Sequence, residues 1–377
     1  MNRFVFYPVG QGLFYSGQLS CHPYRRCRRN FIFDCGGDEP YIGEAVERFA
    51  DEIGYDDVDL CVISHLHRDH YNGLALLKSK GIRINNIVLP YLPSRYPALK
   101  FVYIVGQYYS ESKNLDITED DIANISLMSR FYRVQESNPS DRDFCEQVQT
   151  FEECKIEHGF KYFQREESIS PYNDKKWVFE LFNKSITDEK WEEYNNKLND
   201  LLDVEDIENP IDLFPDSVDK LIEICKSVFG KNLNLTSIVM KHYYQGRTIG
   251  YYPVQDNGMA LLDRYFAVKY PFVFERRIEN VSVLTGDAEF DDELWQHTFE
   301  DAHSISVLQV PHHGARTNWN KLKLPSDIMC KLVISYGLGN RHKHPNRDVV
   351  KDILGMPNCQ LVSVNQATQY EYSIENK

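Results

Sequence analysis

Short runs of apolar residues recur at both ends of the chain, separated by turns rich in Gly and Asp. Runs of β-branched and aromatic residues that are bounded by turn residues predict buried strands. The predicted strands cover residues 3–7, 31–34, 60–64, 86–90, 237–240, 281–284, 306–310 and 331–335. Helical patterns lie between several of these runs, and an alternation of strands with helices favours an α/β fold.

The middle of the chain has a different pattern. Apolar residues recur at helical spacing after Ser185 and again after Ser217, where the run ends at Gly230. The apolar positions are Trp191, Tyr194, Leu198, Leu201 and Leu202 in the first stretch, and Val218, Leu221, Ile222, Cys225 and Val228 in the second. This spacing predicts two amphipathic helices, because glycine commonly ends a helix.

The charge of the chain is concentrated in the same middle region. The 377 residues carry a formal net charge of −14. Residues 111–230 hold 29 acidic and 14 basic side chains, a net charge of −15, so the rest of the chain carries about +1. We therefore predict an α/β sandwich whose halves, 1–92 and 232–377, are separated by an acidic, mainly helical insertion at 93–231.

Composition excludes several classes of protein. With 42% hydrophobic and 26% charged residues, the chain can bury a sizeable core, which excludes a disordered or fibrous protein. No apolar run of about 18 residues occurs, and the first residues lack the pattern of a signal peptide, so we expect no membrane span and no secretion. Nine cysteines without Cys-x-x-Cys spacing indicate reduced thiols and a cytoplasmic protein.

A cluster of potential metal ligands follows the apolar run 60–63. Its sequence is Ser64-His65-Leu66-His67-Arg68-Asp69-His70. In an extended segment, His65 and His67 point to the same side, and a tight turn can bring Asp69 and His70 to a second position a few ångströms away. Imidazole and carboxylate groups are ligands that Zn²⁺, Mn²⁺ and Fe²⁺ accept. The spacing therefore predicts two neighbouring metal sites.

Three later strand ends carry further candidates. Asp287 ends the run 281–287, where a carboxylate can bridge two cations. His312 and His313 follow the run 306–310, and one of the two can complete the second metal site. His342 and His344 close the segment that follows the predicted strand 331–335. Each position alone is a weak signal, but their repetition at strand ends is a stronger one.

These residues resemble the metallo-β-lactamase fold superfamily. The resemblance is carried by Phe31 to Gly37, the motif His65 to His70, Thr285-Gly286-Asp287 and a late histidine. The chain is most similar to the hydrolase domain of ComEC-type DNA-uptake proteins and their free-standing relatives, through Val9-Gly10-Gln11-Gly12, Val310-Pro311-His312-His313-Gly314 and the stretch from Ser335 to Pro345. The resemblance implies a four-layer αββα sandwich formed by the two flanks, and it does not extend to the acidic insertion.

The chain departs from this family in two places. Pro8 and Leu13 stand where aspartates usually bracket the Val-Gly-Gln-Gly stretch. Asn234 begins an Asn-x-x-Ser stretch, as in the ComEC-like group, where the superfamily usually has a third metal-binding histidine. We therefore expect the first metal site to lack one protein ligand and to be weak, to be filled by substrate or water, or to hold Mn²⁺ rather than Zn²⁺.

The resemblance also implies roles for the candidates. The implied ligands of two divalent ions, Zn²⁺ or Mn²⁺, are His65 and His67 for the first ion, Asp69 and His70 with His312 or His313 for the second, and Asp287 as the bridge. Asp34, and Asn234 near it, would support the ligands by hydrogen bonds. Asp69 would also orient the attacking water, Arg341 would clamp a phosphate, and His344 would protonate the leaving group.

We therefore expect a metal-dependent phosphodiesterase or nuclease that acts on a nucleic acid or a nucleotide. The net charge of −14 disfavours a polyanion substrate only as an average, because the flanks are near neutral and carry basic residues such as Arg25 to Arg29 and Arg341. One alternative is a hydrolase of another ester, thioester or lactam on the same fold. The other is a regulated subunit of a multi-component, defence-type system, in which the acidic insertion 111–230 docks a basic protein partner or covers the cleft.

Overall fold

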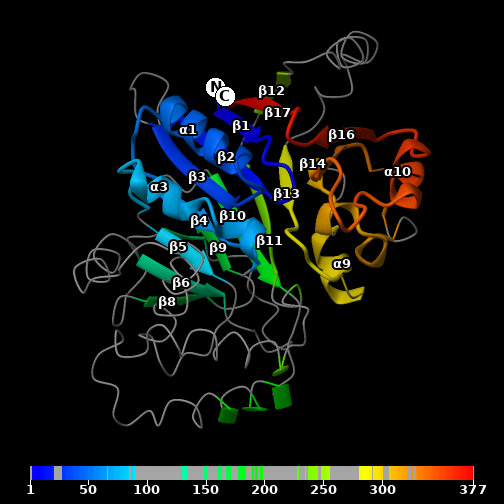
Figure 1. Cartoon of the computed structure of the whole chain (residues 1–377), viewed down its shortest axis with the longest axis horizontal. Helices are drawn as coiled ribbons and strands as arrows, with labels where there is room; N and C mark the ends of the chain where they lie inside the picture. Colours follow the sequence, from blue (N-terminus) through cyan, green and yellow to red (C-terminus); the bar gives the residue numbers. More distant parts are fainter. Residues whose placement is uncertain are drawn as a thin grey trace.

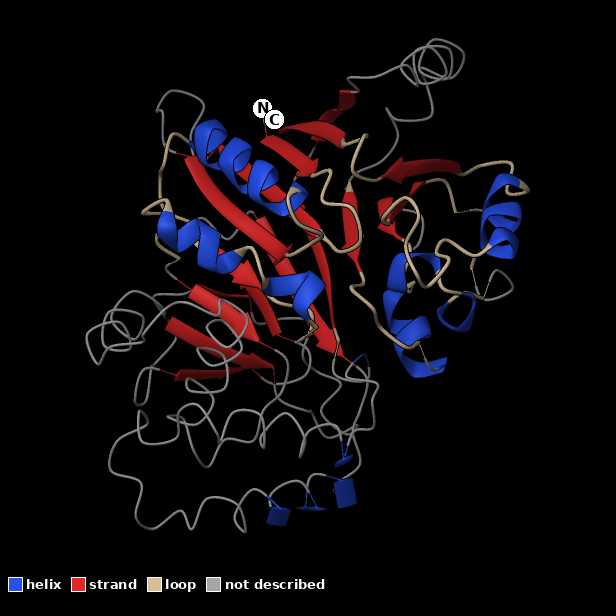
Figure 2. Cartoon of the chain, viewed as in Figure 1, coloured by secondary structure: helices blue, strands red, loops and turns tan. Residues whose placement is uncertain are grey.

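The computed structural model describes most of both flanks and a set of strands between them (Figure 1). The described residues are 2–20, 28–65, 67–84, 86–89, 130–134, 148–150, 160–163, 167–170, 177–183, 189–190, 192–193, 196–197, 227–228, 234, 237–244, 248–254, 280–290, 292–299, 305–320, 324–325 and 328–376. In the described residues the fold is mixed α/β, with two mixed β-sheets and few helices (Figure 2). The predicted fold class is confirmed at this level.

The first sheet contains nine strands among the described residues, in the spatial order β12-β17-β1-β2-β3-β4-β5-β6-β8. The strands are β1 (Asn2–Phe6), β2 (Phe14–Ser20), β3 (Arg28–Cys35), β4 (Leu60–Val62), β5 (Asn86–Leu89), β6 (Arg130–Val134), β8 (Phe160–Phe163), β12 (Thr248–Val254) and β17 (Tyr370–Asn376). Neighbours from β12 to β3 are antiparallel, whereas neighbours from β3 to β8 are parallel. The carboxyl ends of β3, β4 and β5 therefore lie at one edge.

The second sheet contains eight strands among the described residues, in the order β16-β15-β14-β13-β11-β10-β9-β7. The strands are β7 (Val148–Thr150), β9 (Glu167–Ser170), β10 (Trp177–Asn183), β11 (Ile238–Tyr244), β13 (Val281–Leu284), β14 (Ile305–Gln309), β15 (Lys331–Ser335) and β16 (Gln360–Val364). The four strands from β13 to β16 are parallel, so their carboxyl ends also share one edge.

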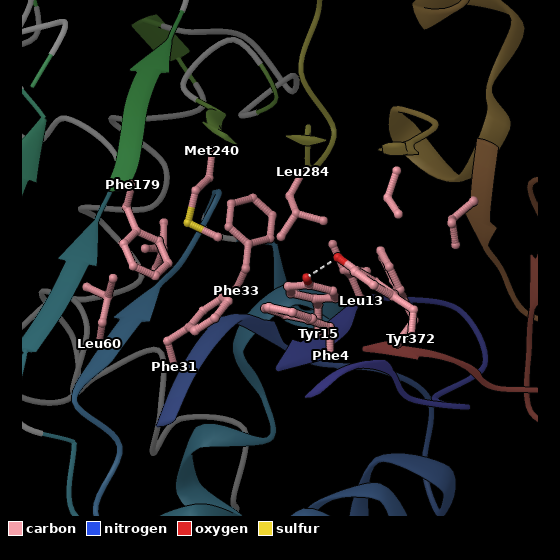
Figure 3. Close-up of a cluster of buried hydrophobic side chains, with 14 of the residues drawn as sticks. Phe4, Leu13, Tyr15, Phe31, Phe33, Leu60, Phe179, Met240, Leu284 and Tyr372 are labelled. Carbon is pink, nitrogen blue, oxygen red and sulfur yellow. Dashed lines mark hydrogen bonds between the residues drawn. The ribbon is translucent and has the colours of Figure 1, made fainter. Parts of the chain in front are cut away.

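A hydrophobic cluster joins the two sheets. Figure 3 shows Phe4, Phe31 and Tyr15 of the first sheet against Phe179 and Met240 of the second, all of them buried. Polar groups form a chain inside this cluster, since the Tyr15 hydroxyl lies 2.7 Å from His242 Nε2 and 2.6 Å from the Tyr372 hydroxyl, which is 2.6 Å from Ser282 Oγ. The core between the sheets is thus mainly aromatic, with hydrogen bonds that cross from one sheet to the other.

The described helices cover the outer sides of the sheets. They are α1 (Tyr41–Ile53), α2 (Arg68–Tyr71), α3 (Leu74–Ser79), α9 (Asp292–Thr298) and α10 (Arg347–Leu354). α1 lies across the first sheet (Figure 1), and its Phe49 ring meets the rings of Tyr7 and Phe14. A second cluster joins Trp295 of α9 and Ile353 of α10 to residues of β13, β14 and β15. Both faces of the second sheet are therefore packed.

All eight strands predicted for the flanks are confirmed, as β1, β3, β4, β5, β11, β13, β14 and β15. The predicted insertion at 93–231 differs from expectation in its described part, because residues 130–183 contribute the strands β6 to β10 rather than helices. β10 pairs with β11 along its length and places Phe179 in the core. Of the two predicted helices, the structure describes only short helical pieces at 189–190, 192–193, 196–197 and 227–228.

None of the described helices is long and apolar enough to cross a membrane.

Candidate metal centre

Polar side chains from both sheets meet at the carboxyl ends of the parallel strands. Asp34 lies near the end of β3, His65 to His70 follow β4, Asp287 follows β13, and His312 and His313 follow β14. Hydrogen bonds join the two sheets at this edge, since Ile238 N donates to Ser64 O at 2.8 Å. Residues from four strand ends, far apart in sequence, therefore lie within a few ångströms of one another.

Asp34 is the buried anchor of the first histidines. Its Oδ1 accepts a hydrogen bond from Ser64 N (2.6 Å), and its Oδ2 lies 2.6 Å from Ser64 Oγ and 2.7 Å from His70 Nδ1. Because a carboxylate only accepts, His70 Nδ1 carries a proton, so a metal ion can bind this ring only at Nε2. Ser64 Oγ gives its proton to Asp34 and can accept from His65 Nδ1, which is 3.0 Å away. The same anchor therefore makes Nε2 the nitrogen of both imidazoles that can bind a cation.

Asp287 lies between four imidazoles. Its Oδ1 is 3.4 Å from His70 Nε2 and 3.6 Å from His313 Nε2. Its Oδ2 is 3.7 Å from His65 Nε2 and 3.5 Å from His312 Nε2. These distances are long for direct hydrogen bonds, but they approach the separation of about 3.3 Å between two ligands of one tetrahedral metal ion. Each carboxylate oxygen thus faces its own pair of imidazole nitrogens.

The turn that aims Asp287 is held by Gln309, the last residue of β14. Gln309 Oε1 accepts from Thr285 N (2.8 Å) and from Gly286 N (2.9 Å), while its Nε2 donates to Gly286 O at 3.2 Å. The same Gly286 carbonyl accepts from His312 N at 3.1 Å. One buried amide side chain therefore ties the turn that carries Asp287 to the segment that carries the histidine pair.

The histidine pair sits in an unusual turn. His312 and His313 have φ values of 49° and 52°, in the left-handed region, and Gly314 follows with φ 78°. This conformation costs a non-glycine residue about 1–2 kcal/mol, and such strain persists where the surroundings hold it in place. The turn directs the two rings to different oxygens of Asp287, and His313 Nδ1 donates to Ser335 O at 2.9 Å.

His67 and Asp69 occupy opposite sides of this arrangement. His67 Nδ1 lies 2.9 Å from His65 Nε2, whereas Asp69 Oδ2 lies 3.4 Å from His313 Nε2. The segment is fixed by its backbone, because Leu13 N donates to Asp69 O at 3.1 Å. Gly36 passes so close to the backbone of Asp69 and His70 that a Cβ atom there would overlap it. Gly36, directly after β3, therefore makes room for the turn that carries Asp69 and His70.

The residues fit divalent metal ions by three criteria. The ligand atoms of His65, His70 and Asp287 lie within 4.8 Å of one another, and so do those of Asp69, His70 and His313. The donors are imidazole nitrogens and carboxylate oxygens, which suit zinc and manganese. Among the described residues, the buried atoms His70 Nε2, Asp287 Oδ1 and His313 Nε2 have no hydrogen-bond partner. Each such atom costs about 1–3 kcal/mol when it is unpaired, and a cation between them removes that cost.

The pKa values of the buried histidines are shifted by the carboxylates around them. Burial lowers the pKa of His70, but the charges of Asp287 and Asp34 outweigh burial, and the net pKa lies well above the ordinary value. For His313, burial likewise lowers the pKa and Asp287 with Asp69 raises it above the ordinary value. Burial and the neighbouring His70 lower the pKa of His65. The carboxylates thus draw positive charge to His70 and His313, whether that charge is a proton or a metal ion.

The two carboxylates that face these imidazoles are shifted the other way. Burial raises the pKa of Asp287, but the charges of His313 and His70 outweigh it and bring the pKa well below its ordinary value. Burial also raises the pKa of Asp69, and the hydrogen bond to His313 reverses this and lowers the pKa. Both groups therefore remain ionised at neutral pH.

His344 lies beside the centre, and Arg341 lies on the surface. The His344 ring is 5.4 Å from the His312 ring, and Asn340 holds the intervening loop by bonding both the amide and the carbonyl of His344. Burial, followed by the nearby His312 and His313, lowers the pKa of His344 to about 4. His344 is therefore neutral near pH 7, so the acid role predicted for it requires this pKa to rise. Arg341 is exposed and its Nε donates to His342 Nε2 at 3.0 Å.

The structure thus brings together most of the predicted site residues. They are Asp34, His65, His67, Asp69, His70, Asn234, Asp287, His312 and His313, with His344 at the rim. It groups His313, rather than His312, with Asp69 and His70. Sequence reasoning missed Ser64, Gln309 and Asn318, which hold the ligands in place. Of the three, only Ser64 could have been suspected from the sequence, because it directly precedes His65.

No model of a protein family matches the sequence, and a search of curated proteins finds no match either.

Proposed function

We propose that the protein is a metal-dependent hydrolase of the metallo-β-lactamase fold, and that it cleaves phosphodiester bonds in a nucleic acid or a nucleotide. The observation that carries the proposal is Asp287, whose two buried carboxylate oxygens each face a pair of imidazole nitrogens. A carboxylate placed in this way is suited to bridge two divalent cations, either Zn²⁺ or Mn²⁺. The residues that would hold them are His65, His67, Asp69, His70, Asp287 and His313.

Support for the fold family comes from the packing. A core cluster fills the space between the two sheets, and helices pack against the outer sides. This agrees with the four-layer αββα sandwich that the motifs suggest. The ligand-bearing segments lie at the carboxyl ends of parallel strands, which is where α/β sheets commonly form their sites. The similarity to ComEC-type hydrolase domains, and the cytoplasmic location expected from the cysteines, remain predictions.

Two divalent cations at such a centre supply a nucleophilic water at neutral pH and neutralise charge on phosphoryl oxygens. The side chains of the protein orient the metal-binding groups and the attacking water. Asp34 fixes the tautomer of His70, and Gln309 fixes the turn of Asp287. Asp69 is ionised and a third exposed, so its carboxylate can accept a hydrogen bond from the attacking water and orient it.

The proposed role of His344 depends on the substrate. With a pKa lowered to about 4, mainly by burial, the imidazole is neutral in the free protein. A negatively charged phosphoryl group beside the ring raises this pKa, because an opposite charge favours the protonated form. His344 would then carry the proton that the leaving oxygen needs. Arg341 lies on the same loop. We propose that its guanidinium gives up the hydrogen bond to His342 Nε2 and contacts a substrate phosphate instead.

The acidic insertion favours one further candidate function. Residues 111–230 carry the net charge of −15, while the rest of the chain, which includes the proposed metal centre, carries about +1. A regulated subunit, in which this block docks a basic protein partner, accounts for that separation. The described strands β6 to β10 of this block belong to the two sheets.

The test is a hydrolysis assay with the full chain, loaded with Mn²⁺ or Zn²⁺. The substrates are bis-p-nitrophenyl phosphate, single-stranded DNA, RNA and cyclic dinucleotides, with a carboxyl ester, a thioester and a β-lactam as alternatives. We expect phosphodiester cleavage, and we expect Asp287→Asn to lower kcat/KM about 100-fold or more. Asp56→Asn, at an exposed carboxylate far from the centre in the loop before β4, is the control that keeps activity. Cleavage of only the alternative substrates, or an active Asp287→Asn, contradicts the proposal.

A further inference from the structure

His312 shares an oxygen of Asp287 with His65. His312 Nε2 lies 3.5 Å from Asp287 Oδ2, and His65 Nε2 lies 3.7 Å from the same oxygen. The neighbouring His313 instead faces Asp287 Oδ1 at 3.6 Å, and it also faces Asp69 at 3.4 Å. The two adjacent histidines are therefore divided between the two sides of one carboxylate.

The tautomer of His312 is fixed by Asn318. The Asn318 amide nitrogen donates to Asp287 O (3.2 Å) and Ala288 O (3.0 Å), which determines the orientation of that side chain. Its Oδ1 therefore faces His312 Nδ1, at 3.0 Å, as an acceptor. His312 must carry its proton on Nδ1, and Nε2 keeps the lone pair that points toward Asp287. A lone pair that faces a carboxylate is repelled unless a cation lies between them.

Asn234 contacts the same nitrogen of the His312 ring as Asn318 does. It occupies the position at which the sequence lacks a third histidine, and its side-chain amide lies 3.2 Å from His312 Nδ1. Its Oδ1 is buried and has no hydrogen-bond partner among the described residues. Turning the amide over places this oxygen against the Nδ1 proton, which it then shares with Asn318 Oδ1, since amide oxygen and nitrogen positions are assigned from the hydrogen-bond network. Two amide oxygens then hold the imidazole as an Nε2 ligand, as carbonyl groups commonly do at metal sites.

We propose that His312 is a ligand of the first metal ion, together with His65, His67 and Asp287 Oδ2, and that it supplies the ligand that Asn234 does not. His313 then belongs to the second ion, with Asp69, His70 and Asp287 Oδ1. The inference rests on the proposed metal centre. It assigns both members of the pair, where the sequence left a choice between them, and it gives the first ion four protein ligands.

The test is the metal content and affinity of the full chain and three variants. The purified protein is stripped with a chelator and titrated with Co²⁺ and Mn²⁺, and the visible spectrum of the Co²⁺ form is recorded. The variants are His312→Ala, His313→Ala and, as a control, His342→Ala at an exposed histidine of the nearby loop. We expect two ions in the wild type and in the control. In each of the other two variants we expect one tight site and one whose affinity falls about 100-fold or more, with a changed Co²⁺ spectrum.

The outcomes separate this inference from the proposed function. A His312→Ala protein that binds two ions with wild-type affinity and an unchanged spectrum overturns the inference, even if its activity falls, because His312 would then serve only the substrate. A wild type that binds no metal overturns both proposals. A wild type that binds two ions but hydrolyses no phosphodiester contradicts only the proposed function. If His312→Ala does not fold by circular dichroism, His312→Gln, which retains a hydrogen-bonding group, is titrated in its place with the same criteria.

Discussion

His70 Nδ1 lies 2.7 Å from Asp34 Oδ2, and both side chains are fully buried. In Asp34→Asn, the amide oxygen is expected to stay with Ser64 N, which turns the NH₂ group toward His70. Nδ1 must then accept, and its proton moves to Nε2, where it blocks the metal. We expect metal affinity to fall about 10- to 100-fold, measured by titration calorimetry with Mn²⁺. An unchanged affinity would show that Asp34 does not set this tautomer.

Gln309 holds the Asp287 turn with three hydrogen bonds. Gln309→Leu leaves the amides of Thr285 and Gly286 buried without an acceptor, at about 1–3 kcal/mol each. We expect the free energy of unfolding to fall by about 2–5 kcal/mol in urea denaturation of the metal-free protein. Gln309→Glu retains an acceptor for these amides, and burial favours its protonated carboxyl group, which can donate to Gly286 O, so a smaller loss is expected below neutral pH. Equal losses in the two variants would contradict this reading.

Position 286 requires glycine for two reasons, its left-handed backbone conformation and the lack of space for a side chain. Its φ is 52°, and a Cβ atom there would lie 2.5 Å from Ser64 Cβ and Oγ. Gly54 has φ 68° with nothing within 4 Å of its Cβ position, so Gly54→Ala measures the backbone cost alone, about 1–2 kcal/mol. We expect Gly286→Ala to be the more destabilising, by about 1–3 kcal/mol, and to weaken metal binding because Ser64 must move. Matching losses with intact metal affinity would show that the Ser64 contact is unimportant.

His242 makes stability depend on pH. Burial lowers its pKa to about 3, whereas the unfolded chain has a histidine pKa of about 6.5. The stability is therefore complete above pH 6.5 and is lost progressively as pH falls toward 3, because only the unfolded chain takes up the proton. Between pH 6.5 and 5 this contributes a loss of about 2 kcal/mol. We expect His242→Phe to lose less stability than wild type over this range, in urea denaturation with chelator present. Parallel pH profiles would contradict the assignment.

The strands of the flanks were predictable because each contains a short apolar run. In β3 the run Phe31–Phe33 is buried, β4 is apolar throughout, and in β14 Ile305, Val307 and Leu308 are buried on both faces. β2 was missed because it contains Gly17 and three polar residues, which the pattern marks as a turn. In the fold, Gly17 leaves space for the Phe31 ring on the neighbouring strand. That reason is visible only once the two strands are paired.

The middle of the chain shows the limit of local pattern. Trp177 to Asn183 is itself rich in aromatic and β-branched residues, which favour a strand, but the helical pattern and acidic composition of the segments after it led to a helical expectation for the whole block. The segment pairs along its whole length with β11, some sixty residues away, and places Phe179 in the shared core. The pairing partner could not be read from the local pattern.

The candidate site divides in the same way. The candidate ligand positions were predictable, because histidines and aspartates stand directly after apolar strands. The different oxygens of Asp287 that His312 and His313 face were not, because they depend on two consecutive left-handed residues after β14. Gln309 and Asn318 were not predictable either, since each acts on backbone groups more than 20 residues away. Nothing in their own surroundings distinguishes them from ordinary polar residues.

The proposed function requires Asp287 to bridge two divalent ions, and anomalous diffraction from manganese-soaked crystals of the wild-type chain would locate these ions. We expect two anomalous peaks, one beside each carboxylate oxygen of Asp287, with His65 and His70 nitrogens as ligands of different ions. A single peak, or no peak within bonding distance of Asp287, would rule out the proposed bridge.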